Sequence, residues 1–161
     1  MTVTRSSTDV DALTLTFVTD FEAPLARVWQ LWADPRLLER WWGPPTWPAT
    51  FRAYDFRAGG GAHYVMTGPD GEEAHGVWRI TSVEDHERIE FEDGFATDTG
   101  EFDPTLGVTR AEVAFQEVRG RTTMTVVSRF ESREQFDQLA AMGMEEGMRS
   151  ALEQIDGLLA G

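Results

Sequence analysis

The residues best suited to acid–base chemistry in this sequence are two histidines, His63 and His75, with a glutamate, Glu73, close to the second. A tight turn at Gly68 to Gly71 is predicted to pair their two strands, so that the imidazoles could approach each other. An imidazole beside a carboxylate can act as a general acid or base near neutral pH. Exposed or edge histidines are the simpler interpretation, and we predict no catalytic residue.

Other common reactive arrangements are missing from the sequence. It contains no cysteine, so a thiolate nucleophile, a disulfide and a zinc-thiolate site are all excluded. The three histidines lack the close spacing of metal-ligating motifs, and there is no Walker, Rossmann or G-x-S-x-G motif. We therefore expect no bound metal and no cofactor.

Large apolar side chains on the predicted strands and on the C-terminal segment suggest enclosure of a ligand. Trp78 lies in the middle of a strand and could line a cavity or fill a core. Ser128 is a lone hydroxyl in an alternating apolar row from Met124 to Phe130, where it could orient a ligand or bond to backbone. Methionines on the last segment would give an adaptable surface. The predicted ligand-binding residues are Trp78, His63, Phe91, Phe115, Met124, Ser128, Met144 and Met148.

The charge balance narrows the range of partners. The 161 residues carry 28 Asp and Glu against 14 cationic residues, all of them arginine, for a formal charge of −14. Such an acidic surface repels phosphate backbones and anionic headgroups, so no nucleic acid is expected as partner. No window approaches the length of a membrane span, and the first residues lack the apolar run of a signal peptide. We expect a cytoplasmic protein without membrane insertion.

The elements that must position these residues begin with a strand. Leu13 to Asp20 alternates apolar residues with threonine, which is the period of a half-buried strand. Two proline-initiated segments, Ala23 to Trp32 and Asp34 to Trp42, carry apolar residues at helical spacing. Strands with short connections then run from Ala49 to Phe130, which implies antiparallel pairing. The longer polar loop Asp93 to Thr105 interrupts them and could form a lid.

The last predicted element is the longest. Ser132 and Gln135 form a capping-box signature, and apolar residues then recur at three- and four-residue spacing to the C-terminus. Such a stripe needs a large apolar partner, which the concave face of a curved sheet provides. We predict an α+β fold in which a curved antiparallel sheet of six to seven strands grips one long C-terminal helix, with two short helices after the first strand. Residues 12–161 would form this single domain, after a flexible N-terminus at residues 1–11.

Four motifs follow one another along the chain. They read FEAP…VW..W.DP..L..WWGP from Phe21, D.R.GG from Asp55, PDGEE…GVW from Pro69 and MEEGM…L..I..LL from Met144. In this order they resemble the START-related (SRPBCC, helix-grip) superfamily, and within it the branch of the C-terminal domain of the activator of the Hsp90 ATPase. The resemblance extends from about Phe17 to the C-terminus. Members of the superfamily enclose an apolar cavity between sheet and long helix.

The resemblance implies a small-molecule-binding protein that holds an apolar or aromatic ligand between the sheet and the C-terminal helix. A non-catalytic role is preferred, and enzyme activity is left open. Two alternatives remain, a cyclase- or hydratase-type enzyme that uses His63 or His75 with Glu73, and a protein-interaction domain of the co-chaperone kind. The expected partner is a small apolar or aromatic molecule, and a homodimer is also left open.

Overall fold

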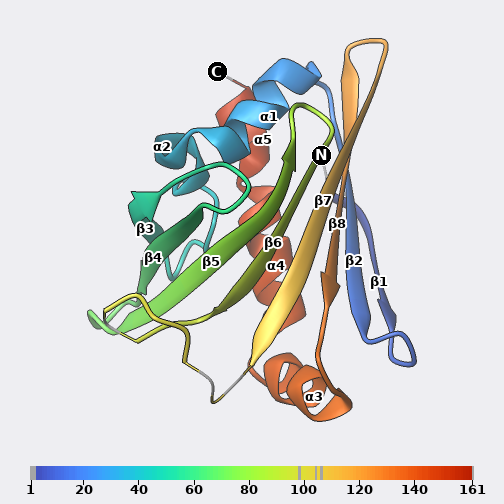
Figure 1. Ribbon diagram of the computed structural model, residues 1–161. Helices are drawn as coiled ribbons and strands as arrows, with labels where there is room; N and C mark the ends of the chain where they lie inside the picture. Colours follow the sequence, from blue (N-terminus) through green and yellow to red (C-terminus); the bar gives the residue numbers. More distant parts are fainter. Residues whose placement is uncertain (1–2, 98, 104, 106, 161) are drawn as a thin grey trace.

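The computed structural model describes residues 3–97, 99–103, 105 and 107–160. One antiparallel sheet of eight strands, in the order β1-β2-β8-β7-β6-β5-β4-β3, curves around the C-terminal helices (Figure 1). The strands are β1 (Val3–Asp9), β2 (Thr14–Phe21), β3 (Ala49–Tyr54), β4 (Gly61–Thr67), β5 (Glu73–Glu84), β6 (Arg88–Phe95), β7 (Val108–Val118) and β8 (Arg121–Arg129). The helices are α1 (Leu25–Ala33), α2 (Pro35–Leu38), α3 (Arg133–Ala141), α4 (Met144–Glu153) and α5 (Ile155–Leu159).

Short turns connect most neighbouring strands, which is why the pairing is antiparallel as predicted. The link between β7 and β8 consists of Arg119 and Gly120, whose φ angles are both positive at 55° and 76°. Two positive φ angles match the twist of a two-residue hairpin, and glycine adopts one of them without strain. The turn from Gly68 to Gly71 joins β4 to β5 in the same antiparallel way.

Tryptophans fill the end of the core beneath α1 and α2. Trp32 and Trp41 pack edge to face with ring centroids 4.9 Å apart, and the Trp32 indole donates a hydrogen bond to the sulfur of Met124 at 3.2 Å. Trp42 and Trp78 are also buried and lie 5.0 Å apart between centroids. Trp41 and Trp42 therefore pack the short helices onto the sheet and offer no ligand a free stacking face.

The C-terminal segment does not form the one long helix that the apolar spacing predicts. Gly143 adopts a φ of +83° between α3 and α4, and this left-handed conformation stops the first helix. The predicted N-cap is present, because the Ser132 side chain accepts a hydrogen bond from the Gln135 backbone N–H at 3.0 Å. Figure 1 shows α3 at one end of the sheet and α4 lying along its face. No helix in the described part of the chain is long and apolar enough to cross a membrane.

The N-terminal residues also differ from the prediction of a flexible segment over 1–11. Val3–Asp9 forms the edge strand β1, which pairs with β2 and raises the strand number to eight. Ser6 donates a hydrogen bond to Glu145 on α4 at 3.0 Å, and Arg149 of the same helix donates one to Ser6. These contacts to a distant helix order a polar stretch that has no apolar alternation of its own, which is why the sequence pattern missed it.

Candidate functional site

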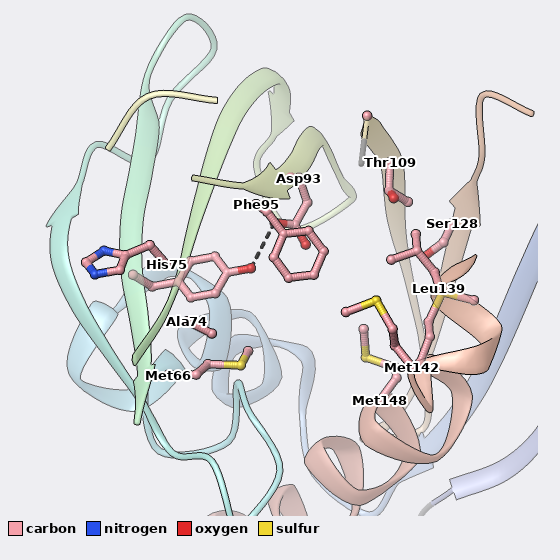
Figure 2. A pocket seen from close by; sticks show the side chains of 14 residues that line it. Met66, Ala74, His75, Asp93, Phe95, Thr109, Ser128, Leu139, Met142 and Met148 are labelled. Carbon is pink, nitrogen blue, oxygen red and sulfur yellow. Dashed lines mark hydrogen bonds between the residues drawn. The ribbon is translucent and has the colours of Figure 1, made fainter. Parts of the chain in front are cut away.

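A pocket of about 270 Å³ opens between the sheet and the corner where α3 meets α4 (Figure 2). It lies on the helix-bearing face, beyond the end of the tryptophan core. Apolar side chains supply most of its wall, and five strands and two helices contribute to it. The lining residues are Tyr64, Met66, Ala74, His75, Asp93, Gly94, Phe95, Gly107, Thr109, Ser128, Leu139, Met142, Met144 and Met148.

One side of the pocket carries a polar pair on neighbouring strands. Tyr64 of β4 reaches across β5 at Gly76, and its hydroxyl donates a hydrogen bond to Oδ1 of Asp93 on β6 at 2.9 Å (dashed line in Figure 2). A Cβ at Gly76 would lie 2.1 Å from Cζ of the Tyr64 ring. A side chain at this position would therefore push the ring away, so Gly76 is what lets Tyr64 reach the carboxyl group.

Burial changes the ionisation of both members of this pair. Desolvation raises the pKa of Asp93 to about 7, even though the hydrogen bond from Tyr64 favours the ionised form. Desolvation, followed by the neighbouring Asp93 charge, raises the pKa of Tyr64 well above its usual value. The buried indole N–H groups of Trp42 and Trp78 make no hydrogen bond to the described residues, but both favour the ionised form of Tyr64, and Trp78 also favours that of Asp93.

The opposite side of the pocket is formed by the helices and the end of the sheet. Figure 2 shows Met142 and Met148 facing the cavity from the α3–α4 corner, across from Asp93. Ser128 and Thr109, on the paired strands β8 and β7, add two hydroxyl groups to this side. Methionine side chains adjust easily to the shape of what they contact, so this wall can accommodate ligands of different outline.

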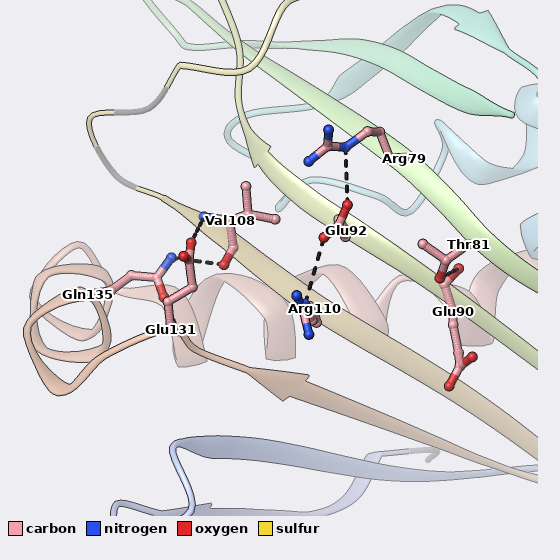
Figure 3. A network of polar contacts seen from close by, with 8 residues as sticks. All are labelled: Arg79, Thr81, Glu90, Glu92, Val108, Arg110, Glu131 and Gln135. Carbon is pink, nitrogen blue, oxygen red and sulfur yellow. Dashed lines mark hydrogen bonds and ion pairs between the residues drawn. The ribbon is translucent and has the colours of Figure 1, made fainter. Parts of the chain in front are cut away.

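The position of α3 over the pocket depends on a polar clasp at the start of β7 (Figure 3). Gln135 Nε2 donates a hydrogen bond to the Val108 carbonyl at 3.2 Å, and the Glu131 carboxylate accepts one from the Val108 backbone N–H. The Gln135 carbonyl oxygen in turn accepts a hydrogen bond from the Glu131 backbone N–H at 2.6 Å. Gln135 is buried, so these hydrogen bonds fix the first turn of α3 against the sheet.

The histidine pair forms as predicted, but on the other face of the sheet. His63 Nε2 lies 3.0 Å from His75 Nδ1, and His75 Nε2 lies 3.4 Å from Glu73. Strand alternation places these side chains opposite Tyr64, and Figure 2 shows the His75 ring directed away from the cavity. Desolvation, then His75 and Arg52, lower the pKa of His63. No cluster of three potential metal ligands occurs in the described part of the chain.

Of the predicted ligand-binding residues, the structure brings three together in the pocket, namely Ser128, Met144 and Met148. The others lie elsewhere, because the inward-facing side chains of each strand extend beyond the pocket. The part of the sheet near α1 is covered by packed side chains and leaves no open space. Trp78, Phe91 and Met124 are almost completely buried in the core, Phe115 packs against Trp29 with centroids 5.4 Å apart, and His63 is on the outer face.

The loop predicted as a lid, Asp93 to Thr105, takes a different course in its described part. Residues 98 and 104 lie outside the described residues, and β6 extends to Phe95. The Arg79 guanidinium stacks over the Phe102 ring at 4.3 Å, and a Cβ at Gly100 would lie 3.1 Å from the His63 imidazole. These contacts place this part of the loop against the outer face of the sheet and away from the pocket.

Sequence reasoning missed the polar pair itself. A usable signal existed, because Phe91, Asp93 and Phe95 occupy alternate positions and must share one face of β6. A carboxylate in an otherwise apolar row is costly to bury and marks a site of interest. The Tyr64 partner could not be found in this way, since no local pattern indicates which strand lies across from β6.

Comparisons with known proteins agree with this architecture. Residues 22–160 match the family model described as Activator of Hsp90 ATPase homolog 1-like protein. A solution structure of a protein from Arthrobacter aurescens is 52% identical, with a TM-score of 0.94 over 98% of this chain and 92% of that one. A crystal structure of a protein from Mycobacterium smegmatis is 45% identical, with a TM-score of 0.90 over 98% of this chain and 96% of that one. None of the curated proteins matches the chain.

Proposed function

Because the chain belongs to the Activator of Hsp90 ATPase homolog 1-like family, with the helix-grip fold, we propose that it binds a small, largely apolar molecule in the pocket beside α3 and α4. The observation that carries this proposal is an open pocket with a mostly apolar wall and one polar pair facing it. Apolar area removed from water contributes about 25 cal/mol per Å², and a few polar groups fix the orientation of the ligand.

The size of the pocket favours a ligand of modest dimensions. Its volume of about 270 Å³ is close to the lower end of the range for small-molecule sites, which begins at about 300 Å³. Methionines at one wall can move aside for a larger body. A compact molecule with one or two rings and a single polar group fits this combination best.

A second candidate function is acid–base catalysis at the same pocket. The carboxyl group of Asp93 has a pKa of about 7, so near neutral pH it can both give and accept a proton. The histidines of the original enzyme hypothesis do not support this role, since their rings lie on the other face. Conversion of a bound compound that stops in the Asp93→Asn variant would establish catalysis.

The protein-interaction alternative has less support. In the part of the chain that the structure describes, the exposed large apolar side chains are Val10, Val118 and Met142, which lie at separate places in the fold. A docking surface of the apolar kind would gather such residues into one patch.

The proposal can be tested with the neutral two-ring fluorescent dye Prodan and a pocket-filling variant. Ala74 lines the pocket, so Ala74→Phe should fill part of it and weaken dye binding by at least about tenfold. Val118→Phe adds a similar ring at an exposed strand end and serves as the matched control, with dye binding unchanged. Native mass spectrometry of the purified protein should also detect a bound small molecule. Equal dye binding by the wild type and Ala74→Phe would refute the proposal.

A further inference from the structure

We infer that the pocket selects organic amines, whose apolar body lies against the methionine wall while the protonated nitrogen pairs with the Asp93 carboxylate. This inference rests on the proposed function and names the chemical class of its ligand. It follows from the positions of the charged side chains around the pocket, from the groups that face Asp93, and from the negative net charge of the protein.

Asp93 brings a negative charge to the pocket, and no cationic side chain among the described lining residues balances it there. The sequence has no lysine, and none of the lining residues in the described part of the chain is an arginine. The nearest arginines along these strands, Arg79 and Arg110, point to the outer face and pair with Glu92 at 3.1 and 3.7 Å (Figure 3). The hydrogen bond from Tyr64 supplies a neutral donor only.

A bound ammonium group would provide the missing positive charge. A carboxylate that is desolvated without a counter-ion is unfavourable, which is why the pKa of Asp93 rises to about 7. A charge-assisted hydrogen bond from an amine is about twice as strong as one from a neutral donor. A ligand with a carboxylate of its own would instead place two like charges side by side.

Two further features favour a cation. Tyr64 and Phe95 both line the pocket, and their ring faces attract ammonium groups as well as apolar carbon. The protein has a formal charge of −14, and this field draws cations toward the pocket mouth. The hydroxyls of Thr109 and Ser128 on the far side can accept a hydrogen bond from a polar substituent.

Among the described residues, the groups that face Asp93 stay neutral or turn away from it, so they do not complicate its titration. From β4 it meets Tyr64, whose pKa is raised well above the usual value, so the phenol stays neutral. The β5 histidine, His75, turns its ring to His63 on the outer face. The lining residues from β7, β8, α3 and α4 in the described part of the chain carry no ionisable side chain.

Three probes with one phenylbutyl body test this inference: phenylbutylamine, phenylbutanol and phenylbutanoate. Binding is measured by methyl NMR of the protein labelled at its methionines, because Met142, Met144 and Met148 line the pocket while the core residue Met124 serves as internal control. At about pH 8 we expect the amine to bind at least about tenfold more tightly than the alcohol, and the carboxylate more weakly than either.

The Asp93→Asn variant and a pH series complete the design. The variant should lower amine affinity to that of the alcohol. In the wild type, amine affinity should fall by up to about tenfold per pH unit below about pH 7, since the carboxyl group then takes up a proton, while alcohol affinity should not fall.

The outcomes separate the two proposals. If none of the three probes shifts the pocket methionines, the proposed binding function fails. If the alcohol binds as tightly as the amine at both ends of the pH series, the amine inference is overturned while the binding function stands. The wild-type comparison decides this even if Asp93→Asn does not fold.

Discussion

Tyr64 reaches across a whole strand to donate a hydrogen bond to Asp93 at 2.9 Å, and it can do so only because the strand between them presents Gly76 beneath its ring. The two polar groups are thereby held at the edge of an aromatic core and in the wall of an open pocket. A partly buried, desolvated carboxyl group of this kind couples protonation to folding. The absence of a side chain at Gly76 leaves the space in which the Tyr64 ring lies.

The first prediction concerns the pH dependence of stability. The pKa of Asp93 rises from 3.8 to about 7 on folding, so the folded protein keeps a proton that the unfolded chain releases. This contribution to the free energy of unfolding is fully present below about pH 4 and is lost as the pH rises to about 7. Asp93→Asn cannot titrate, so its stability relative to wild type should increase by up to about 1.4 kcal/mol per pH unit in that window.

Urea unfolding of both proteins at several pH values between about 5 and about 8 measures this difference. Asp11→Asn, at an exposed surface position, is the control and should follow the wild-type profile. Parallel curves for wild type and Asp93→Asn would show that the carboxyl group is not desolvated.

The second prediction concerns Gly76. Its substitution by alanine brings a methyl group into the Tyr64 ring. Trp42, Phe51 and Trp78 pack against that ring and leave it little room to move. Gly76→Ala should therefore lower the free energy of unfolding by about 1–3 kcal/mol. Gly147→Ala is the matched control, since its Cβ would meet no atom within 4 Å and it lies inside α4, where alanine should add about 0.5–1 kcal/mol. A Gly76→Ala variant as stable as wild type would contradict the packing described here.

The third prediction concerns the clasp that holds α3. Gln135→Ala removes the hydrogen bonds of the buried amide to Val108 and Glu131, which should cost about 1–3 kcal/mol of stability. Amide hydrogen exchange in α3 should accelerate at the same time. Gln138→Ala, on the exposed side of the same helix, should change neither quantity. Unchanged exchange in Gln135→Ala would mean that apolar packing alone positions α3.

The fourth prediction separates the outer-face histidines from the pocket. His63 was a candidate ligand-binding residue from the sequence, but its ring contacts His75 on the far side of the sheet. His63→Gln should therefore leave Prodan binding within about twofold of wild type. A loss of about tenfold would restore the original histidine hypothesis.

Much of the fold could be predicted because its signals are local. The Ser132 cap and the alternation from Met124 to Phe130 each depend on residues close in sequence, and each is present in the structure. The family resemblance added the order in which these elements are assembled. The break at Gly143 was missed, because a glycine inside an apolar helical pattern can continue a helix or end it, and only its φ angle decides.

The site was predicted less well than the fold. The apolar rows were correctly placed on the inner face, but the sequence does not say where along a row the packed core ends and the open pocket begins. Ser128, Met144 and Met148 lie beyond that point, and Trp78 and Met124 lie before it. The volume of the tryptophans beneath α1 and α2 determines this limit, and it is a property of the assembled molecule.

The amino-acid sequence by itself determined an acidic α+β protein of the helix-grip kind, because strand period, turn residues and helix caps act over a few neighbouring positions. Only the tertiary structure decided that Tyr64 meets Asp93, that His63 turns away from the cavity, and that the polar strand β1 is held by α4. These pairings join residues far apart in the chain. Their geometry depends on strand register and on how completely side chains fill the space over the inner face of the sheet. No local sequence pattern contains that information.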